Sequence, residues 1–556
     1  MLNEKKKKND RNKYKEYGMR KDAHRNYMDG LSYDLSPFAR LYVMATSAFF
    51  GEDGYYGETR RGETPKSIHV EHAQGLFGSF GIAMVELFSC GNRAEAMKKA
   101  IDESLAYDAE LTLKFLAWLR REALIRATPA VGLAVASRSD AVRNLIAEKG
   151  SSAFRDCAQG VLSRLDDATN CLAYYLKEYG KPIPNSLKKV LAKRVSDAKE
   201  YELAKYAGKN KDVSLKDVIR LTHAHSNAVD LFYNDRLSQA QEGNETWEAI
   251  ISREGSNKES WTKAVGVMGH MALLRNLRNL ARHEVDKGLY LQKLIDGVKT
   301  GKQLPFRYYS AWQEVYDADV RRALEKCIDI SIENLPKLPG RSLILVDNSG
   351  SARHCRVSKM SNVSVSVAGN LMGVLTGLVS ESGKIGAFGD KIKYLPINSG
   401  FKGTALGLLN VLNDEIGATV GQGTENGIWL ALDDAIRSGE KFDRIFIYSD
   451  MQAGHGGLYG IGSEYPKYDT GESFETQRFI DVPLLVSEYR KRVNPDCKLY
   501  SIQIGGYSDN IFPEFYPNTC IMGGWSTEIL KFVDMFEKNP AEIEGIFRKK
   551  FALPKR

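Results

Sequence analysis

The chain has 556 residues, of which 43% are hydrophobic and 27% are charged, and its formal net charge at pH 7 is +8. This length exceeds the usual size of one domain, and the composition is that of a globular protein rather than a fibrous or disordered one. No apolar run is long enough to cross a bilayer, and the N-terminus lacks the apolar core of a signal peptide, so we expect no membrane contact and a cytoplasmic location. The seven cysteines form no Cys-x-x-Cys pair, which favours reduced thiols and argues against a zinc site.

Residues 1–28 are predicted to form a basic, disordered tail. Within it, residues 1–27 hold ten Lys and Arg against four Asp and Glu, which accounts for six of the eight net positive charges. Two functions fit such a segment. It is either a solubilising tail or an arm that follows a phosphate backbone.

Residues 29–338 show mainly helical periodicity. A first helix is expected after Ser36-Pro37, because serine caps a helix and proline suits its first position. Ser214 and Asp217 are spaced as a capping box. Further helices are expected over 75–90, 94–104, 109–124, 128–136, 156–179, 186–207, 215–221, 261–284 and 309–332. Many helices with no strands between them predict an all-α solenoid of helix pairs.

Beyond a proline-containing linker at 335–339, the pattern changes to alternating strands and helices. The expected strands are 342–346, 384–388, 444–448 and 498–504, and the expected helices are 361–380, 404–416, 426–438, 482–492 and 527–536. This alternation predicts a parallel sheet with helices on both faces and ligands beyond the carboxyl ends of the strands. Residues 339–556 are therefore predicted to form a Rossmann-like α/β domain.

A candidate metal site follows the first of these strands. Asp347, Ser349 and Ser351 lie two residues apart, and their oxygen-only ligands suit Mg²⁺. Thr424 on a glycine turn and Asp450 after another apolar strand would add two more oxygen ligands. Otherwise the two serines cap the next helix and Asp450 is an ordinary turn residue. We find no paired acid and base and no Walker motif, so we interpret the site as binding rather than catalytic.

A second candidate site is the predicted helix at 268–284, where Arg275, Arg278 and Arg282 share one face. This face is either a solvated basic surface or a row of guanidinium groups along an RNA backbone. Five other basic side chains are further candidates for RNA contact, namely Lys114, Arg120, Arg126, His223 and His225.

The set Asp347-x-Ser349-x-Ser351, Thr424 and Asp450 resembles the metal-ion-dependent adhesion site of the von Willebrand factor A domain. The resemblance implies that the α/β domain binds a divalent cation, with Mg²⁺ as the first choice. Two positions depart from the family pattern, because Asn348 and Ala352 stand where an apolar residue and a methionine are usual. Neither belongs to the ligand set.

The helical part resembles the TROVE module of the Ro ribonucleoprotein family. The resemblance rests on ALLRN at 272–276, LPFR at 304–307, RLTH at 220–223, RATP at 126–129 and FFGEDGYY at 49–56. It implies a ring of HEAT-like helical repeats joined to the A domain. It also implies binding of small non-coding Y-like RNAs and of the 3′ ends of misfolded or unprocessed RNAs, with an exoribonuclease as partner in RNA quality control.

Three functions are compatible with these patterns. The first is a monomeric, non-catalytic RNA-binding component of a ribonucleoprotein. The second is a protein-interaction scaffold whose A domain captures an acidic partner through Mg²⁺. The third, a metal-dependent hydrolase, lacks a general base in the sequence. We therefore expect that the protein is not an enzyme.

Overall fold

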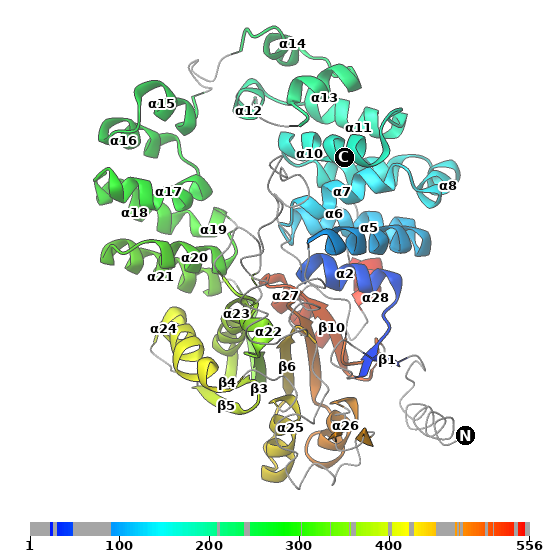
Figure 1. Ribbon diagram of the computed structural model, residues 1–556, viewed down its shortest axis with the longest axis vertical. Helices are drawn as coiled ribbons and strands as arrows, with labels where there is room; N and C mark the ends of the chain where they lie inside the picture. The colour runs from blue at the N-terminus through cyan, green and yellow to red at the C-terminus, as the bar shows by residue number, and fades with distance from the viewer. Residues whose placement is uncertain are drawn as a thin grey trace. The chain divides into compact units, whose positions relative to one another are not determined.

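The computed structural model (Figure 1) divides into two compact units, one formed by Met1–Ala48 and Gln239–Ile546 and the other by Phe49–Ser238 and Phe547–Arg556. The structure describes residues 23–25, 31–47, 90–207, 212–237, 245–301, 303–333, 335–354, 356, 363–398, 403–421, 427–451, 473–474, 477–478, 482–505, 510–514, 516–538 and 543–550. The expected helix at 75–90, the loop at 49–56, most of the basic tail and Thr424 lie outside these residues.

The second unit is α-helical throughout its described part. Its helices are α5 (Cys90–Tyr107), α6 (Ala109–Arg121), α7 (Ala127–Ala136), α8 (Asp140–Lys149), α9 (Ser152–Val161), α10 (Leu165–Tyr179), α11 (Asn185–Ser196), α12 (Glu200–Lys205), α13 (Leu215–Thr222) and α14 (Asn227–Tyr233). The predicted capping box is confirmed, because the backbone N–H of Asp217 donates to Ser214 Oγ at 3.2 Å and that of Ser214 donates to Asp217 Oδ2 at 3.0 Å. It fixes the first turn of α13.

The expected helix at 156–179 is wrong in one respect, since the structure contains two helices there. The chain leaves the helical path between α9 and α10, where the carboxylate of Asp167 accepts hydrogen bonds from the backbone N–H of Arg164 at 2.9 Å and from Ser163 Oγ at 3.2 Å. A side chain that satisfies the exposed N–H groups of a new first turn makes such a break stable.

Seven further helices belong to the first unit and precede the sheet. They are α15 (Trp247–Glu254), α16 (Lys258–Val267), α17 (His270–Arg282), α18 (Lys287–Asp296), α19 (Val298–Gly301), α20 (Pro305–Glu314) and α21 (Ala318–Glu333). The helices expected at 261–284 and 309–332 are again each divided in two. Met268 and Val315 adopt extended backbone conformations at the two breaks, and Asp317 then caps α21 by accepting from the N–H groups of Asp319 and Val320.

The α/β part is built on a six-stranded sheet in the order β10-β9-β6-β3-β4-β5. Its strands are β3 (Leu338–Asp347), β4 (Ser380–Phe388), β5 (Ile392–Asn398), β6 (Arg444–Ser449), β9 (Lys498–Gln503) and β10 (Thr519–Gly523). All neighbours are parallel except β4 and β5. Val346 of β3 pairs with Tyr448 of β6, so the ends of these two strands lie side by side. The predicted fold class, an all-α region followed by an α/β domain, is confirmed.

The helices around this sheet include one that packs unusually closely. The helices of the α/β part are α22 (Gly350–His354), α23 (Val365–Val379), α24 (Ala405–Asn410), the π-helix η1 (Val411–Ile416), the 3₁₀ helix η2 (Gly417–Thr419), α25 (Gly427–Ser438), α26 (Val482–Arg492) and α27 (Glu528–Lys538). The helix α28 (Ile543–Lys550) follows them in the chain. A Cβ on Gly373 of α23 would lie 2.5 Å from Val346 of β3. Glycine therefore lets α23 approach the central strand.

The first unit also contains the N-terminal helix α2 (Pro37–Ser47), which packs on β10. The predicted cap is confirmed by the hydrogen bond from the N–H of Ala39 to Ser36 Oγ at 3.3 Å. Ser36 Oγ in turn donates to Glu514 Oε1 at 2.8 Å. The short pairs β1 (Ala23–Arg25) with β2 (Leu31–Tyr33) and β7 (Ser473–Phe474) with β8 (Gln477–Arg478) complete the described elements.

Two general expectations concern thiols and membranes. Among the described residues, five cysteines are buried and form no disulfide, namely Cys157, Cys171, Cys327, Cys497 and Cys520. Among the helices that the structure describes, none combines the length and the apolar character needed to cross a bilayer.

Candidate functional site

The carboxyl end of β3 gathers the first three predicted metal ligands. Asp347 is the last residue of the strand and is fully buried, as is Ser349. The backbone N–H of Ser349 donates to Asp347 Oδ1 at 2.9 Å, and the hydroxyls of Ser349 and Ser351 lie 3.2 Å apart. The chain thus folds back over the strand end and directs these oxygens to one place.

Asp450 joins this cluster from the neighbouring strand β6. Ser351 Oγ donates to Asp450 Oδ2 at 2.7 Å, and Ser449 Oγ donates to Asp347 Oδ2 at 2.6 Å. Met451 has a φ of +61°, a left-handed conformation that non-glycine residues adopt rarely. This strained residue directly follows Asp450, and strained backbone conformations of this kind cluster at functional sites.

The donor set fits a hard divalent cation. Asp347, Ser349, Ser351 and Asp450 supply only carboxylate and hydroxyl oxygens, which Mg²⁺ prefers. Burial raises the pKa of Asp347, because the charged form loses its hydration, and a cation beside it would favour the charged form. No group of three His, Cys, Asp or Glu suited to a metal occurs among the described residues. A metal site here therefore depends on the hydroxyl groups.

Arg353 on α22 links this cluster to the loop that precedes Thr424. Its guanidinium donates to the carbonyl oxygen of Gly421. The negative charge of Asp347 acts to raise the pKa of Arg353, although the larger effect of burial lowers it. Arg353 therefore lies within electrostatic reach of the oxygen cluster while it holds the backbone of the neighbouring loop.

Asn348, the departure from the family pattern, is part of a buried amide network that the sequence did not predict. Asn348 and Asn370 of α23 exchange hydrogen bonds of 2.9 and 2.8 Å, and Asn370 Nδ2 donates to Asn413 Oδ1 of η1 at 2.7 Å. The polar residue at 348 was the one signal for these partners, because a buried amide needs hydrogen-bonding neighbours.

The arginines of α17 are arranged as the sequence predicts. Arg275, Arg278 and Arg282 are exposed, while Leu273, Leu277 and Leu280 on the opposite side are buried, as shown by the exposure of each side chain. Arg278 forms an ion pair with Glu314 of α20 at 3.0 Å. Within the described part of the chain, the structure records no ion pair for Arg275 or Arg282. Their guanidinium groups are therefore available to an external anion.

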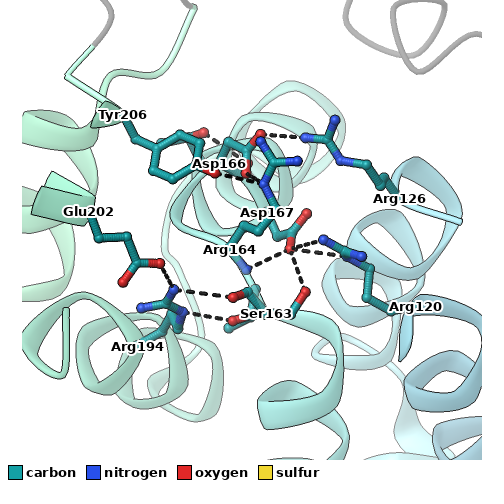
Figure 2. Close-up of polar contacts among 11 residues, drawn as sticks. Arg120, Arg126, Ser163, Arg164, Asp166, Asp167, Arg194, Glu202 and Tyr206 are labelled. Carbon is teal, nitrogen blue, oxygen red and sulfur yellow. Dashed lines mark hydrogen bonds and ion pairs between the residues drawn. The ribbon is translucent and has the colours of Figure 1, made fainter. Parts of the chain in front are cut away.

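Arg120 and Arg126 are placed differently. Figure 2 shows both guanidinium groups directed at consecutive carboxylates at the start of α10. Arg120 is 7% exposed and donates to Asp167 Oδ2 at 3.0 and 3.1 Å, and Arg126 donates to Asp166. Burial raises the pKa of Asp167, and Arg120 opposes that rise. Arg120 thus joins α6 to α10 and does not present its charge to solvent, which runs against its predicted RNA contact.

The same network extends to α11 and α12. Arg194 donates to the carbonyl oxygen of Leu162 at 2.8 Å and to the carboxylate of Glu202 (Figure 2). Arg164 Nε donates to the hydroxyl of Tyr206 at 2.8 Å, and its guanidinium lies 5.2 Å from the centre of that ring. These contacts connect consecutive helices of the second unit through charged side chains at the helix ends.

The remaining candidates belong to the second unit, where Lys114 is only partly exposed. Lys114 pairs with Glu110 at 3.3 Å within α6. His223 ends α13 in a left-handed conformation, and His225 lies 3.3 Å from Asp230. The two histidines are exposed and close in sequence. Their predicted contact with RNA stays a prediction.

The fold and the sequence together define an α-helical region joined to an α/β domain. Residues 236–326 match the family model of the TROVE domain. The crystal structure of the Deinococcus radiodurans RO (RSR) protein matches over 91% of this chain and 99% of its own, with 14% identity and a TM-score of 0.54. These findings confirm the predicted resemblance to the Ro family in fold and in its TROVE domain. The von Willebrand factor A part of the resemblance stays a prediction.

Weaker similarities add nothing to this picture. The PilB minor pilin from Streptococcus sanguinis matches over 37% of this chain and 62% of its own, with 14% identity and a TM-score of 0.23. Its D319A mutant gives a TM-score of 0.24 at 12% identity. Scores this low carry no argument about fold. No sequence among the curated proteins matches the chain.

Proposed function

We propose that this protein binds RNA and that the exposed arginine face of α17 is part of the RNA-binding surface. The observation that carries the proposal is the row Arg275, Arg278 and Arg282 inside the segment that matches the TROVE domain. Planar guanidinium groups at helical spacing suit the regular phosphates of a nucleic acid backbone. Outside residues 1–27 the chain carries only about two net positive charges, so binding depends on such local clusters.

The RNA partners follow from the resemblance to the Ro family. They are small non-coding Y-like RNAs and the 3′ ends of misfolded or unprocessed RNAs, bound by a monomeric cytoplasmic protein that works beside an exoribonuclease and is not itself an enzyme. Structured RNAs with single-stranded 3′ tails are therefore the appropriate probes. Single strands expose their bases for recognition, whereas RNA duplexes are read mainly by shape.

The oxygen cluster at the end of β3 is proposed to bind Mg²⁺ through Asp347, Ser349, Ser351, Asp450 and Thr424. The ion would supply an open coordination position for an anionic oxygen, either a phosphate of the RNA or a carboxylate of a protein. Three of the ligands are neutral hydroxyls, so the bound ion keeps residual positive charge. This part of the proposal is supported by the way the hydrogen bonds collect four of the five side chains.

Salt dependence tests the RNA-binding proposal. In a gel-shift titration with a small structured RNA that carries a free 3′ tail, the logarithm of the affinity should fall linearly with the logarithm of the salt concentration. Replacing Arg275 and Arg282 with Ala should weaken binding and lower that slope by about 2, because each lost phosphate contact removes about one unit. Arg143→Ala is the matched control, since Arg143 is exposed and pairs within its own helix.

Two results would contradict RNA binding. One is the absence of any shifted band at low salt. The other is a double variant that binds with the affinity and the slope of the unchanged protein. The alternative function, a scaffold that captures an acidic protein, is favoured by one observation, the oxygen cluster itself. It predicts Mg²⁺-dependent binding of a carboxylate-rich protein that persists in the Arg275 and Arg282 double variant.

A further inference from the structure

Tyr316, in the turn between α20 and α21, is exposed to an unusual degree. It is 85% exposed, whereas the next most exposed large hydrophobic residues of the described chain, Tyr107 and Leu289, are 48% exposed. A single exposed aromatic ring is common on protein surfaces, so exposure alone assigns no function to Tyr316. What distinguishes this residue is the set of groups that surround it.

The ring of Tyr316 is the outermost member of a series of neighbouring planar side-chain groups. The guanidinium of Arg321 lies 5.4 Å from the centre of the Tyr316 ring and 4.3 Å from the Trp312 ring. Trp312 is stacked with Tyr309 at an interplanar angle of 9° and a centroid distance of 6.3 Å. Tyr309 is almost fully buried. The series thus runs from the core to the surface and ends with the exposed ring of Tyr316.

Arg321 is fixed in place. Its Nε donates to the carbonyl oxygen of Val315 at 2.6 Å, so the guanidinium bridges the start of α21 and the residue that precedes Tyr316. A cation over an aromatic ring is attractive, and a guanidinium can stack flat on one. A fixed cation therefore lies beside the ring of Tyr316, although most of that residue's surface faces solvent.

The turn that carries Tyr316 is tied to the arginine helix. Glu314, two residues before Tyr316, pairs with Arg278 of α17 at 3.0 Å, and Asp317, the next residue, pairs with Lys287 of α18 at 2.6 Å. These two ion pairs hold the turn beside the C-terminal half of α17 and the start of α18. All of these residues lie within 236–326, the segment that matches the TROVE domain.

We propose that Tyr316 is a stacking platform for an unpaired base of the RNA whose backbone lies on Arg275, Arg278 and Arg282. The inference rests on the proposed RNA binding and names a residue that reads the single-stranded character of the ligand. An exposed aromatic ring next to a basic helix provides the two components of single-strand recognition, a stacking surface and phosphate contacts. A duplex offers no free base face there, so the ring selects unpaired nucleotides.

The test compares two single-stranded RNA oligomers of equal length, one with bases and one made of abasic nucleotides, by fluorescence anisotropy. Tyr316→Ala should weaken binding of the oligomer with bases by about 5- to 150-fold, the usual effect of losing one stacked base. It should leave the abasic oligomer and the salt slope unchanged. Tyr316→Phe keeps the ring and should bind like the unchanged protein. Tyr233→Ala is the control, because Tyr233 is 41% exposed and also has a cation, Lys216, over its ring.

The outcomes separate this inference from the proposed function. If the unchanged protein binds both oligomers and Tyr316→Ala has no effect, stacking is overturned while RNA binding stands. That result is also the one expected if Tyr316 contacts a protein partner. Equal weakening for both oligomers overturns stacking as well, because the loss then does not depend on bases. If the unchanged protein binds neither the oligomers nor a structured RNA, both proposals fall.

Discussion

At the scale of single residues, Asp347 is a buried carboxylate that accepts hydrogen bonds from a hydroxyl and from a backbone N–H. It is 0% exposed, and Ser449 and Ser349 donate to its two carboxylate oxygens. A buried carboxylate with only neutral donors is costly to ionise. A divalent cation would remove that cost, and the free energy of binding would then stabilise the folded protein.

Replacing Asp347 with Asn should abolish Mg²⁺ binding, because it removes the one negative ligand of the loop while it keeps the size of the side chain. Isothermal titration calorimetry measures the loss, and the thermal unfolding midpoint should rise with Mg²⁺ for the unchanged protein alone. Asp496→Asn is the matched control, since Asp496 is an exposed aspartate of the same α/β part. An Asp347→Asn protein that binds Mg²⁺ with unaltered affinity would refute the site.

The arginine residues of this chain differ in burial and in their ion-pair partners, so we expect them to differ in function. Arg120 is buried against Asp167, 47 positions later, whereas Arg275 is exposed. Removing one member of a buried ion pair leaves the other charge uncompensated, so Arg120→Ala should lower the free energy of unfolding by about 3–5 kcal/mol. Urea unfolding measures this, with Arg143→Ala expected to change it by less than about 0.5 kcal/mol. A loss of RNA affinity without a loss of stability would show that Arg120 contacts RNA instead.

At the scale of elements, α17 begins with a histidine that is packed for its neutral form. His270 Nε2 lies 2.9 Å from the hydroxyl of Tyr308, and Cβ atoms on Gly297 and Gly301 would collide with the imidazole. Burial lowers the pKa of His270. The position at the start of a helix adds to this preference, because the positive end of the helix dipole repels a protonated imidazole.

This arrangement predicts a pH dependence of stability. Below the ordinary histidine pKa of about 6.5, the unfolded chain binds a proton that folded His270 does not bind, so the folded state loses stability as the pH falls. The urea midpoint should therefore drop between about pH 7.5 and about pH 5.5, and His270→Gln should make that drop smaller. Because both proteins contain the other histidines, the difference between their pH curves reports the contribution of His270 alone. Parallel pH curves would contradict the prediction.

The sequence predicted where helices and strands occur better than where they end. Apolar spacing identified the parallel strands β3 and β6 and the helix α17, because these signals are local. It missed the breaks at Met268 and Val315, which carry no proline, and it missed β10, whose five residues follow a loop without periodicity. Tertiary hydrogen bonds such as Asp167 with Arg164 stabilise breaks that local propensity does not announce.

In the candidate sites, too, local features were predicted from the sequence and contacts between distant elements were not. Residues two apart in an extended loop identified Asp347, Ser349 and Ser351, because that geometry is set within the loop itself. Asn370, the partner of Asn348, lies 22 residues away, and Asn413, the next partner of Asn370, lies another 43 residues along the chain. Nothing in the intervening sequence relates them. The ion pairs that bury Arg120 and the exposure of Tyr316 likewise depend on contacts between elements. They could not be read from spacing.

At the scale of the whole molecule, the first described helix is part of the α/β structure that the last third of the chain forms. Tyr42 of α2 meets Phe532 of α27 edge to face at 6.0 Å, and the N–H of Tyr33 donates to the carbonyl of Asn510 at 2.9 Å. A Cβ on Gly523 would lie 2.6 Å from the carbonyl oxygen of Val43. The backbones of α2 and β10 therefore touch, and the α/β part needs residues from both ends of the chain.

The substitution Gly523→Ala tests the close contact between α2 and β10. The added methyl group must push α2 away from β10, so the free energy of unfolding should fall by about 1–3 kcal/mol, the usual effect of overpacking. Limited proteolysis should then cut faster within 31–47. Gly266→Ala is the control, because no atom lies within 4 Å of a Cβ at Gly266, and its effect should be neutral or slightly stabilising. Unchanged stability and proteolysis of the Gly523 variant would mean that α2 docks loosely.

The buried amide network behind the oxygen cluster has a consequence for the evolution of this protein. Asn348 and Asn370 hydrogen-bond each other, and Asn370 Nδ2 also donates to Asn413 Oδ1. A buried polar network in which some groups lack hydrogen-bond partners destabilises the fold more than an apolar core does. Replacing Asn348 alone with an apolar residue would leave the buried Asn370 Oδ1 without its donor. Among homologous sequences, positions 348, 370 and 413 should therefore change as a group, which an alignment of relatives with this fold would reveal as covariation.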